Sequence, residues 1–262
     1  MGVRTKQLGR SGVMVPEIAL GTWQYEGGSA PLRRGIELGA RFIDTAERYK
    51  TEYIVGNALE GIENVFVATK VRHEDLDHDN VIRAAKASLA ALKLDTIDLY
   101  QIHRPNPSIE LKETMAAMDK LVDDGLVRHI GVSNFSIDQL KQAQDLARHP
   151  IVSNQLRYSL VDRTIEKGML DYCAQTGVTL LAYSPLARGL TALAAPGGTT
   201  LAEVAAKEGK SQAQVALNWL LSRPPVVVIV KASTIPHMED VCGASGWDLS
   251  PENIERLNAA YA

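Results

Sequence analysis

Short apolar runs recur along the chain, and segments with a helical repeat of apolar residues separate them. In order, the runs cover residues 18–21, 41–45, 65–70, 97–103, 127–133, 151–155, 179–184 and 226–231. Each run is short and mostly apolar, which predicts strands that are covered on both faces. The sequence therefore predicts eight buried strands.

The segments between these runs carry the signals of amphipathic helices. Residues 79–93 and 111–125 repeat apolar residues three and four positions apart. Gly125 suits the residue just past a helix end, and Ser136 and Ser211 suit helix N-caps. Strand and helix thus alternate along the chain.

This alternation predicts parallel strands joined by helical crossovers. Eight such units in 262 residues favour a (β/α)8 TIM barrel, an α/β fold, over a doubly wound sheet. Residues 5–15 stand outside the repeat and predict an N-terminal β-hairpin that covers the bottom opening of the barrel. The loosest segment, residues 193–200, falls within one loop, so we expect residues 1–262 to form a single domain.

Composition narrows the class of function. The hydrophobic fraction of 45% supports a large core, and a net charge of -3 provides no basic field for nucleic acid or anionic lipid. The longest strongly apolar run, residues 226–230, is too short to span a bilayer, and the N-terminal stretch lacks an export or anchoring signal. We expect a cytoplasmic protein without a nucleic-acid or membrane partner, and a monomer, with an oligomer left open.

The two cysteines give no sign of a metal site or a disulfide framework. Cys173 and Cys242 lie far apart, and neither has the Cys or His spacing that zinc sites use. We predict two buried or half-buried thiols and no metal.

Polar side chains end consecutive strands of the predicted barrel. In chain order they are Asp44, Lys70, His103, Ser133 with Asn134, Gln155, and Tyr183 with Ser184. Any one of them alone suits a helix cap or a solvated strand end. The carboxyl ends of barrel strands meet at one rim, which is where barrel enzymes place their chemistry, so together these residues predict an active site.

Tyr49 follows the second strand and suits the role of a proton donor. A free phenol has a pKa of about 10, and acid catalysis near neutrality favours a value closer to 7. An ammonium at Lys70, held by Asp44, is expected to lower the pKa of Tyr49. His103 is expected to orient a carbonyl oxygen by donating from a neutral ring.

A carbonyl activated in this way still needs a nucleophile, and the chain has no GxSxG motif. A hydride from a nicotinamide cofactor meets this need. Ser133, Asn134 and Gln155 supply the donors and acceptors that a carboxamide requires, and Tyr183 suits a stacking role. No GxGxxG motif follows a strand, so the cofactor is expected to bind on the barrel itself.

At these residues the chain closely resembles the aldo-keto reductase family. The matching motifs, in order, are LGTW (20–23), FIDTAERY (42–49), VFVATK (65–70), LYQIHRP (99–105), GVSNF (131–135), SNQLRYS (153–159), AYSPL (182–186) and VKAST (230–234). The HRPNP segment (103–107) and the shortness of the chain are more similar to a bacterial branch. The resemblance implies a (β/α)8 barrel, carbonyl reduction to alcohols, and NADPH as the cofactor, with NADH possible.

Residue by residue, the resemblance assigns a catalytic tetrad and a cofactor site. It makes Tyr49 the general acid, with Asp44, Lys70 and His103 completing the tetrad. It assigns the carboxamide to Ser133, Asn134 and Gln155, the stacking ring to Tyr183, the pyrophosphate loop to Ser184 and Leu186, and the 2′-phosphate to Lys231 and Thr234.

Three positions depart from the family pattern. Lys50 stands where glycine is usual, His237 stands where many members carry an arginine on the 2′-phosphate, and Val241 replaces an asparagine that meets the adenine. Neutral His237 lacks the bidentate contact of arginine. We therefore expect a modest preference for NADPH over NADH that strengthens as the pH falls through the titration of His237.

Trp23 and Tyr25 follow the first strand and are predicted to be aromatic walls of the substrate pocket, although a packing role for Trp23 suits the sequence nearly as well. The short segment after residue 234 predicts an open pocket that accepts small-molecule carbonyls, namely aldehydes and reactive ketones. Two alternatives remain: a barrel that binds NADPH mainly as a sensor or regulator, and a Schiff-base lyase of the aldolase type with Lys70 as its nucleophile.

Overall fold

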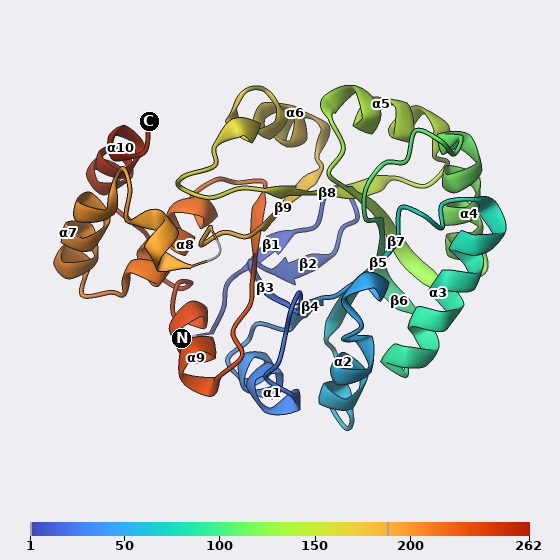
Figure 1. The fold of residues 1–262 in the computed structure, drawn as a ribbon, viewed down its shortest axis with the longest axis horizontal. Coiled ribbons are helices and arrows are strands. Elements are labelled where there is room, and N and C mark those ends of the chain that lie inside the picture. The colour runs from blue at the N-terminus through green and yellow to red at the C-terminus, as the bar shows by residue number, and fades with distance from the viewer. Residues whose placement is uncertain (1, 188) are drawn as a thin grey trace.

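The computed structural model describes residues 2–187 and 189–262, and its centre is a closed barrel of eight parallel strands (Figure 1). In barrel order the strands are β10 (Val226–Val230), β3 (Ile18–Gly21), β4 (Phe42–Asp44), β5 (Phe66–Val71), β6 (Ile97–Ile102), β7 (Val127–Ser133), β8 (Ile151–Arg157) and β9 (Thr179–Tyr183). Each apolar run forms one strand, so the predicted barrel is confirmed. The assignment of the whole chain to one domain stays a prediction.

Helices surround the barrel (Figure 1). They are α1 (Ser29–Glu37), α2 (Glu52–Leu59), α3 (His78–Leu92), α4 (Leu111–Asp123), α5 (Ile137–Leu146), α6 (Met169–Thr176), α7 (Gly198–Glu208), α8 (Gln212–Leu221), α9 (Ile235–Cys242) and α10 (Pro251–Ala260). Short 3-10 turns form at η1 (Glu47–Tyr49), η2 (Thr164–Glu166) and η3 (Leu190–Leu193). Helices α7 and α10 pack against each other at one side of the barrel.

The predicted helix boundaries have the expected cap geometry. Ser136 and Ser211 each accept a bond from the backbone N–H three residues on, and each is part of a complete capping box. Gly125 follows the end of α4 with φ of 73°, a left-handed conformation that glycine adopts without steric cost.

The barrel interior changes from apolar to polar along the strands. Successive inward positions of β5 are Phe66, Ala68 and Lys70, and the first two pack in the interior cluster with Leu99 of β6. Two residues beyond Leu99, the buried Gln101 again introduces a polar group. A second and larger apolar cluster fills the space between the strands and the helices. The carboxyl ends of the strands are therefore the polar end of the barrel.

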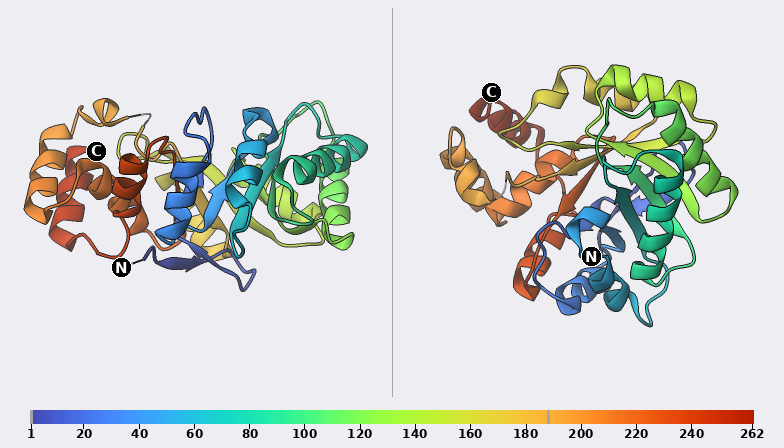
Figure 2. Two further views of the ribbon diagram at one scale, coloured as in Figure 1. Left: turned by 90° about the horizontal axis from the view of Figure 1, so that it is seen from below. Right: turned by 45° about the vertical axis from the view of Figure 1, so that its right-hand side comes forward.

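The N-terminal hairpin closes the apolar end, as predicted. Strands β1 (Thr5–Gln7) and β2 (Met14–Pro16) pair antiparallel, and Leu8 and Val15 join the interior cluster. The Lys6 ammonium donates to carbonyls between the end of α8 and the start of β10, including Val226 O at 2.9 Å. Figure 2 (left) shows the hairpin lying across one end of the barrel.

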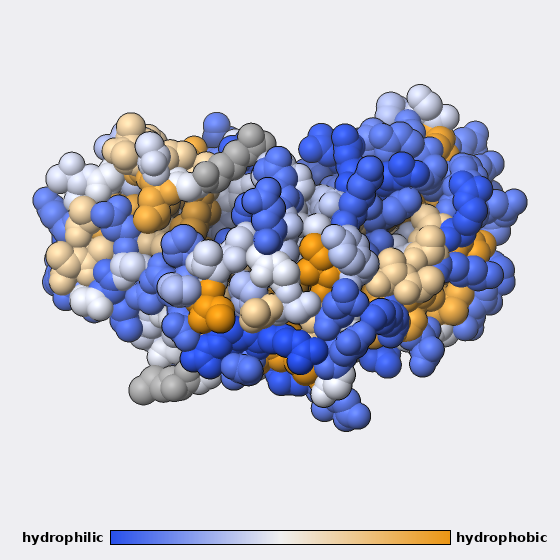
Figure 3. Space-filling model, turned by 60° about the horizontal axis from the view of Figure 1, so that its bottom comes forward, coloured by the Kyte–Doolittle hydropathy of each residue, from blue (hydrophilic) through white to orange (hydrophobic). Residues whose placement is uncertain are grey.

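The outer surface is mainly polar on the face that carries α1, α2 and α9. Figure 3 shows hydrophilic residues over most of this face, with hydrophobic residues in small separate groups. Among the residues described, none of the helices has the length and apolar character needed to cross a bilayer. Cys173 and Cys242 are both buried free thiols, as predicted.

Candidate active site

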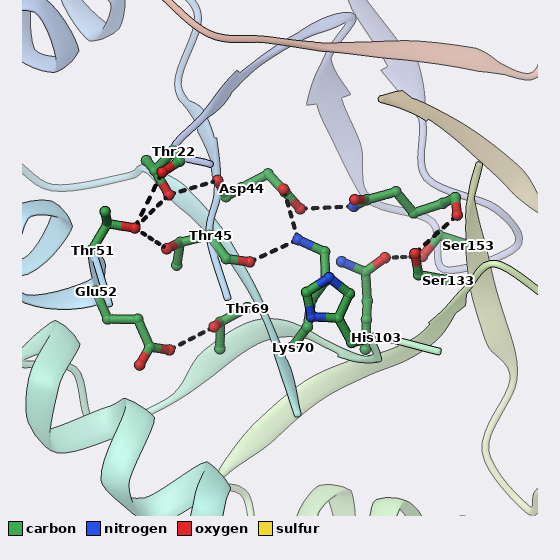
Figure 4. A network of polar contacts seen from close by, with 12 residues as sticks. Thr22, Asp44, Thr45, Thr51, Glu52, Thr69, Lys70, His103, Ser133 and Ser153 are labelled. Atoms are coloured by element: carbon green, nitrogen blue, oxygen red, sulfur yellow. Dashed lines mark hydrogen bonds and ion pairs between the residues drawn. The ribbon is translucent and has the colours of Figure 1, made fainter. Parts of the chain in front are cut away.

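The centre of the candidate site is a buried ion pair between the ends of two neighbouring strands. Asp44 is the last residue of β4, and Lys70 lies near the end of β5. Lys70 Nζ lies 2.7 Å from Asp44 Oδ2, and the two side chains are 0% and 3% exposed (Figure 4). Lys70 Nζ also donates to Thr45 O at 2.8 Å.

The surroundings of Lys70 keep it charged. Burial lowers the pKa of Lys70, but the Asp44 carboxylate and the Tyr49 phenol together outweigh burial, so the pKa lies above its ordinary value. Lys70 is therefore an ammonium throughout the physiological range of pH.

Tyr49 stands over this ammonium. It ends the 3-10 turn that follows β4, and Lys70 Nζ lies 5.0 Å from the centroid of its ring. Burial is the largest influence on the phenol and raises its pKa, Lys70 lowers it, and Asp44 raises it again, so that the pKa of Tyr49 lies above 10. The expectation of a lowered pKa is wrong for this structure, because the loss of water around the phenol exceeds the attraction of Lys70.

His103 faces Tyr49 from the end of β6. The two ring centroids are 5.4 Å apart with an interplanar angle of 82°. Burial, followed by the charges of Lys70 and Arg104, lowers the pKa of His103 to about 3. The ring is therefore neutral at physiological pH, which agrees with the role of a neutral hydrogen-bond donor expected from the sequence.

Gln155 links the ion pair to the opposite side of the barrel. Its Nε2 donates to Asp44 Oδ1 at 2.8 Å, and its backbone O accepts from Ser133 Oγ at 3.0 Å. Gln155 was expected to meet a carboxamide, and here its amide holds the second oxygen of Asp44. Strands β4, β7 and β8 are thereby connected through side chains.

Asn134 and Tyr183 extend this network. Asn134 Nδ2 donates to His103 O at 3.0 Å and to Ser133 Oγ at 2.9 Å. The Tyr183 hydroxyl donates to Asn134 Oδ1 at 3.0 Å. The residues expected to contact a nicotinamide are thus brought together beside the tetrad.

A group of three threonines, which no sequence pattern marks as functional, supports the loop that carries Tyr49. Thr51 Oγ1 donates to Thr22 Oγ1 at 3.0 Å and lies 3.2 Å from Thr45 Oγ1 (Figure 4). All three are buried. Thr45 lies within the FIDTAERY motif and Thr51 two residues beyond it, but a hydroxyl gives no sequence signal of which neighbour it binds.

A second supporting contact lies behind the ion pair. The buried Glu52 accepts from Thr69 Oγ1 at 2.6 Å, and burial raises the pKa of its carboxyl. Glu52 lies in α2 and Thr69 in β5, directly before Lys70, so the bond fixes this helix against the strand.

Lys50, one departure from the family pattern, has an unusual backbone. It adopts a left-handed conformation with φ of 57° and ψ of 32°. Only glycine adopts this region without cost, whereas other L-residues lose about 1 kcal/mol or more. The turn after Tyr49 therefore favours the glycine that is usual there.

A cavity of about 500 Å³ opens beside Tyr49. Its lining residues are Gln24, Tyr25, Glu26, Tyr49, Thr51, Lys231 and Ser233. Tyr25 lines this cavity, and its hydroxyl donates to Gly28 O at 2.9 Å; its role as a wall of the substrate pocket stays a prediction. Trp23 is 43% exposed and does not line this cavity.

The residues expected at the phosphates lie along the loops that follow β9 and β10. Ser184 and Leu186 are half-buried after β9. Lys231 is exposed after β10 and donates to Gln24 O at 3.2 Å. Thr234 caps α9 by accepting from the backbone N–H of His237 at 3.4 Å. An exposed helix start beside a lysine fits an anionic group such as a phosphate.

The two other departures differ in their placement. His237 is exposed in the first turn of α9. Val241 is 5% exposed and packs in the apolar cluster between strands and helices. Valine at this position therefore contributes to the core. In the part of the chain that the structure describes, no cluster of His, Cys, Asp and Glu suits a metal ion.

Comparison with known proteins identifies close relatives of the chain. The sequence model of the "Aldo/keto reductase family" matches residues 17–262. Methylglyoxal reductase YeaE of Escherichia coli K12 is 36% identical over 95% of this chain and 92% of that protein. Glyoxal reductase of Bacillus subtilis is 35% identical over 95% of this chain and 90% of that protein.

Solved structures show the same fold. The thermostable aldo-keto reductase Tm1743, solved with the inhibitor epalrestat, superposes with a TM-score of 0.94 at 38% identity, over 98% of this chain and 99% of that one. An aldo/keto reductase of Klebsiella pneumoniae, solved with NADP and acetate, has a TM-score of 0.90 at 33% identity, over 99% of this chain and 95% of that one.

Proposed function

The chain belongs to the aldo/keto reductase family, and on this premise we propose that it is an NADPH-dependent oxidoreductase that reduces aldehydes and reactive ketones to alcohols, with Tyr49 as proton donor. The observation that carries the proposal is the buried Lys70 ammonium, held by Asp44 beneath Tyr49, with neutral His103 alongside. Relatives named for methylglyoxal and glyoxal reduction support small reactive dicarbonyls among the substrates.

The residues of the site have separate roles in the reaction. NADPH, when bound, supplies a hydride to the carbonyl carbon. The neutral ring of His103 donates a hydrogen bond to the carbonyl oxygen and orients it. Tyr49 transfers its proton to that oxygen as negative charge develops there.

The raised pKa of Tyr49 suits this direction of proton transfer. The phenol is protonated before reaction, so the proton to be given is always present. Once the proton has left, the phenolate lies beside the Lys70 ammonium, and the attraction between these charges stabilises the product side of the step. In alcohol oxidation the same pair acts in reverse, with the phenolate as base.

The residues of the rim fit a nicotinamide dinucleotide. Ser133, Asn134 and Gln155 would hold the carboxamide by exchanging their present bonds, and Tyr183 would stack on the ring. Lys231 and the start of α9 would hold the 2′-phosphate. We expect His237 to give only a modest preference for NADPH over NADH, because an imidazole lacks the planar fork with which an arginine binds a phosphate.

The buried Asp44–Lys70 pair weighs against both alternatives, the Schiff-base lyase and the NADPH sensor. A Schiff base requires a neutral amine, whereas Lys70 is a buried ammonium paired with Asp44. A barrel that served only as an NADPH sensor would not need the Asp44–Lys70 pair beneath Tyr49.

The Tyr49→Phe variant tests the proposal. Loss of the phenolic proton should lower the rate of aldehyde reduction about a hundredfold or more, measured by the disappearance of NADPH absorbance. Tyr53→Phe is the matched control, because Tyr53 lies in the adjoining helix and is 58% exposed. Equal turnover by Tyr49→Phe and the parent protein would end the assignment of Tyr49.

A further inference from the structure

We propose that the mouth of the site selects carbonyl substrates that carry a carboxylate, because Arg48 and Arg104 flank the reacting residues without acidic partners of their own. This inference rests on the proposed function and adds a class of substrate to it. Each arginine is the direct sequence neighbour of a tetrad residue.

Their positions follow from the two segments that carry the tetrad. Arg48 directly precedes Tyr49 in the 3-10 turn after β4, and Arg104 directly follows His103 beyond the end of β6. The edge-to-face contact of Tyr49 and His103, at 5.4 Å, holds the two segments together. Both arginines are exposed, so their side chains lie outside the core, each one residue from a member of the tetrad.

The neighbouring carboxylates are already engaged by other cations. Glu47 lies 3.2 Å from Arg72, and Asp75 also pairs with Arg72 at 2.5 Å. Glu74 lies 3.2 Å from the ring of His73. Within residues 2–187 and 189–262, neither Arg48 nor Arg104 has a carboxylate within 4.0 Å.

The charges of Arg48 and Arg104 act on His103. After burial and Lys70, the guanidinium groups of Arg104 and Arg48 are the next causes that lower the pKa of His103. The same positive field would attract an anionic group attached to the carbonyl substrate. Among the residues that line the cavity, Glu26 carries the opposing charge, and Lys231 lines the cavity as well.

Arginine suits this role because its planar fork matches a carboxylate in a bidentate pair. An exposed pair of this kind acts mainly on substrate binding, since it lies away from the atoms that react. The expected signature is therefore a lower KM for the charged substrate, with kcat unchanged within about twofold.

The test compares two substrates that differ in one charge, para-carboxybenzaldehyde and its methyl ester, with NADPH in excess. The parent protein should use the acid with a kcat/KM about tenfold above that of the ester. The Arg48→Gln/Arg104→Gln variant should bring this ratio close to one, through the KM of the acid alone. The corresponding lysine variant should keep most of the preference, and added salt should weaken it in the parent protein.

Arg83→Gln is the matched control, because Arg83 is exposed on α3 and forms no ion pair within the described residues. It removes the same charge elsewhere and should leave the ratio unchanged. A ratio near one in the parent protein, or an unchanged ratio in the double variant, overturns the inference while the proposed function stands. If the parent protein reduces neither aldehyde, both the inference and the proposed function are refuted.

Discussion

Removal of the negative charge at Asp44 isolates a cation in the interior of the barrel. In Asp44→Asn the Lys70 side chain, 0% exposed, loses the carboxylate that lies 2.7 Å from its Nζ. The variant amide also has only one oxygen, whereas Asp44 accepts from both Lys70 and Gln155. One of these two donors must then face an NH2 group.

The magnitude follows from these contacts. Removal of one partner from a buried ion pair costs about 3–5 kcal/mol, mainly because the remaining charge is left without a partner. At about 2–4 °C per kcal/mol for a protein of this size, the melting temperature should fall by about 10 °C. Aldehyde reduction should fall as well, because Lys70 no longer has a fixed position beneath Tyr49.

The loss of stability should depend on pH with a defined sign. In the parent protein the pKa of Lys70 lies above its unfolded value, so the contribution of the pair is present below about pH 10.5 and is lost above it. In Asp44→Asn, burial without Asp44 brings the folded pKa below the unfolded value. The unfolded chain then binds more protons between the two values, and the stability of the variant rises with pH in that window.

Urea denaturation at about pH 7 and about pH 9 measures this effect. The deficit of the variant should be smaller at the higher pH. Asp98→Asn is the control, because Asp98 is also a buried strand carboxylate but pairs with Arg128, whose side chain is 63% exposed. Loss of the Asp98–Arg128 ion pair should cost about 1 kcal/mol or less, and this cost should not become smaller at the higher pH. A loss below about 1 kcal/mol in Asp44→Asn, or a deficit independent of pH, would refute this reasoning.

Two further results are expected. In urea denaturation, Lys50→Gly should leave the free energy of unfolding unchanged or raise it by up to about 1 kcal/mol, because glycine adopts the left-handed backbone at φ of 57° without strain. A clear loss of stability would show that the contacts of the Lys50 side chain stabilise the protein by more than its backbone conformation costs. The pKa of His103 is near 3 in the folded protein and about 6.5 in the unfolded chain, so its contribution to stability should rise with pH between these values. The pH profile of kcat should show no inflection from His103 between about pH 5 and 8. An inflection near pH 6.5 that disappears in His103→Gln would contradict the neutral ring.

The periodicity of the sequence was sufficient to predict the barrel. Each barrel strand is short and mostly apolar and is followed by a helix, and this pattern depends only on local residue order and on burial from both faces. The caps at Ser136 and Ser211 were predictable for the same reason, since their hydrogen bonds close within three residues. The convergence of Asp44, Lys70 and His103 also followed from the sequence, because parallel strands in a closed barrel place all their carboxyl ends at one rim.

Only the tertiary structure decided the electrostatics and the supporting contacts of that rim. The pKa of Tyr49 lies above 10 because burial, a property of the assembled loop, exceeds the attraction of a lysine that the sequence already placed nearby. The bond from Gln155 to Asp44 crosses the barrel and has no trace in the local pattern. Whether Arg48 and Arg104 are paired depends on which distant carboxylates other cations occupy. Local order therefore determined which groups reach the site, and the three-dimensional surroundings determined their charge and their partners.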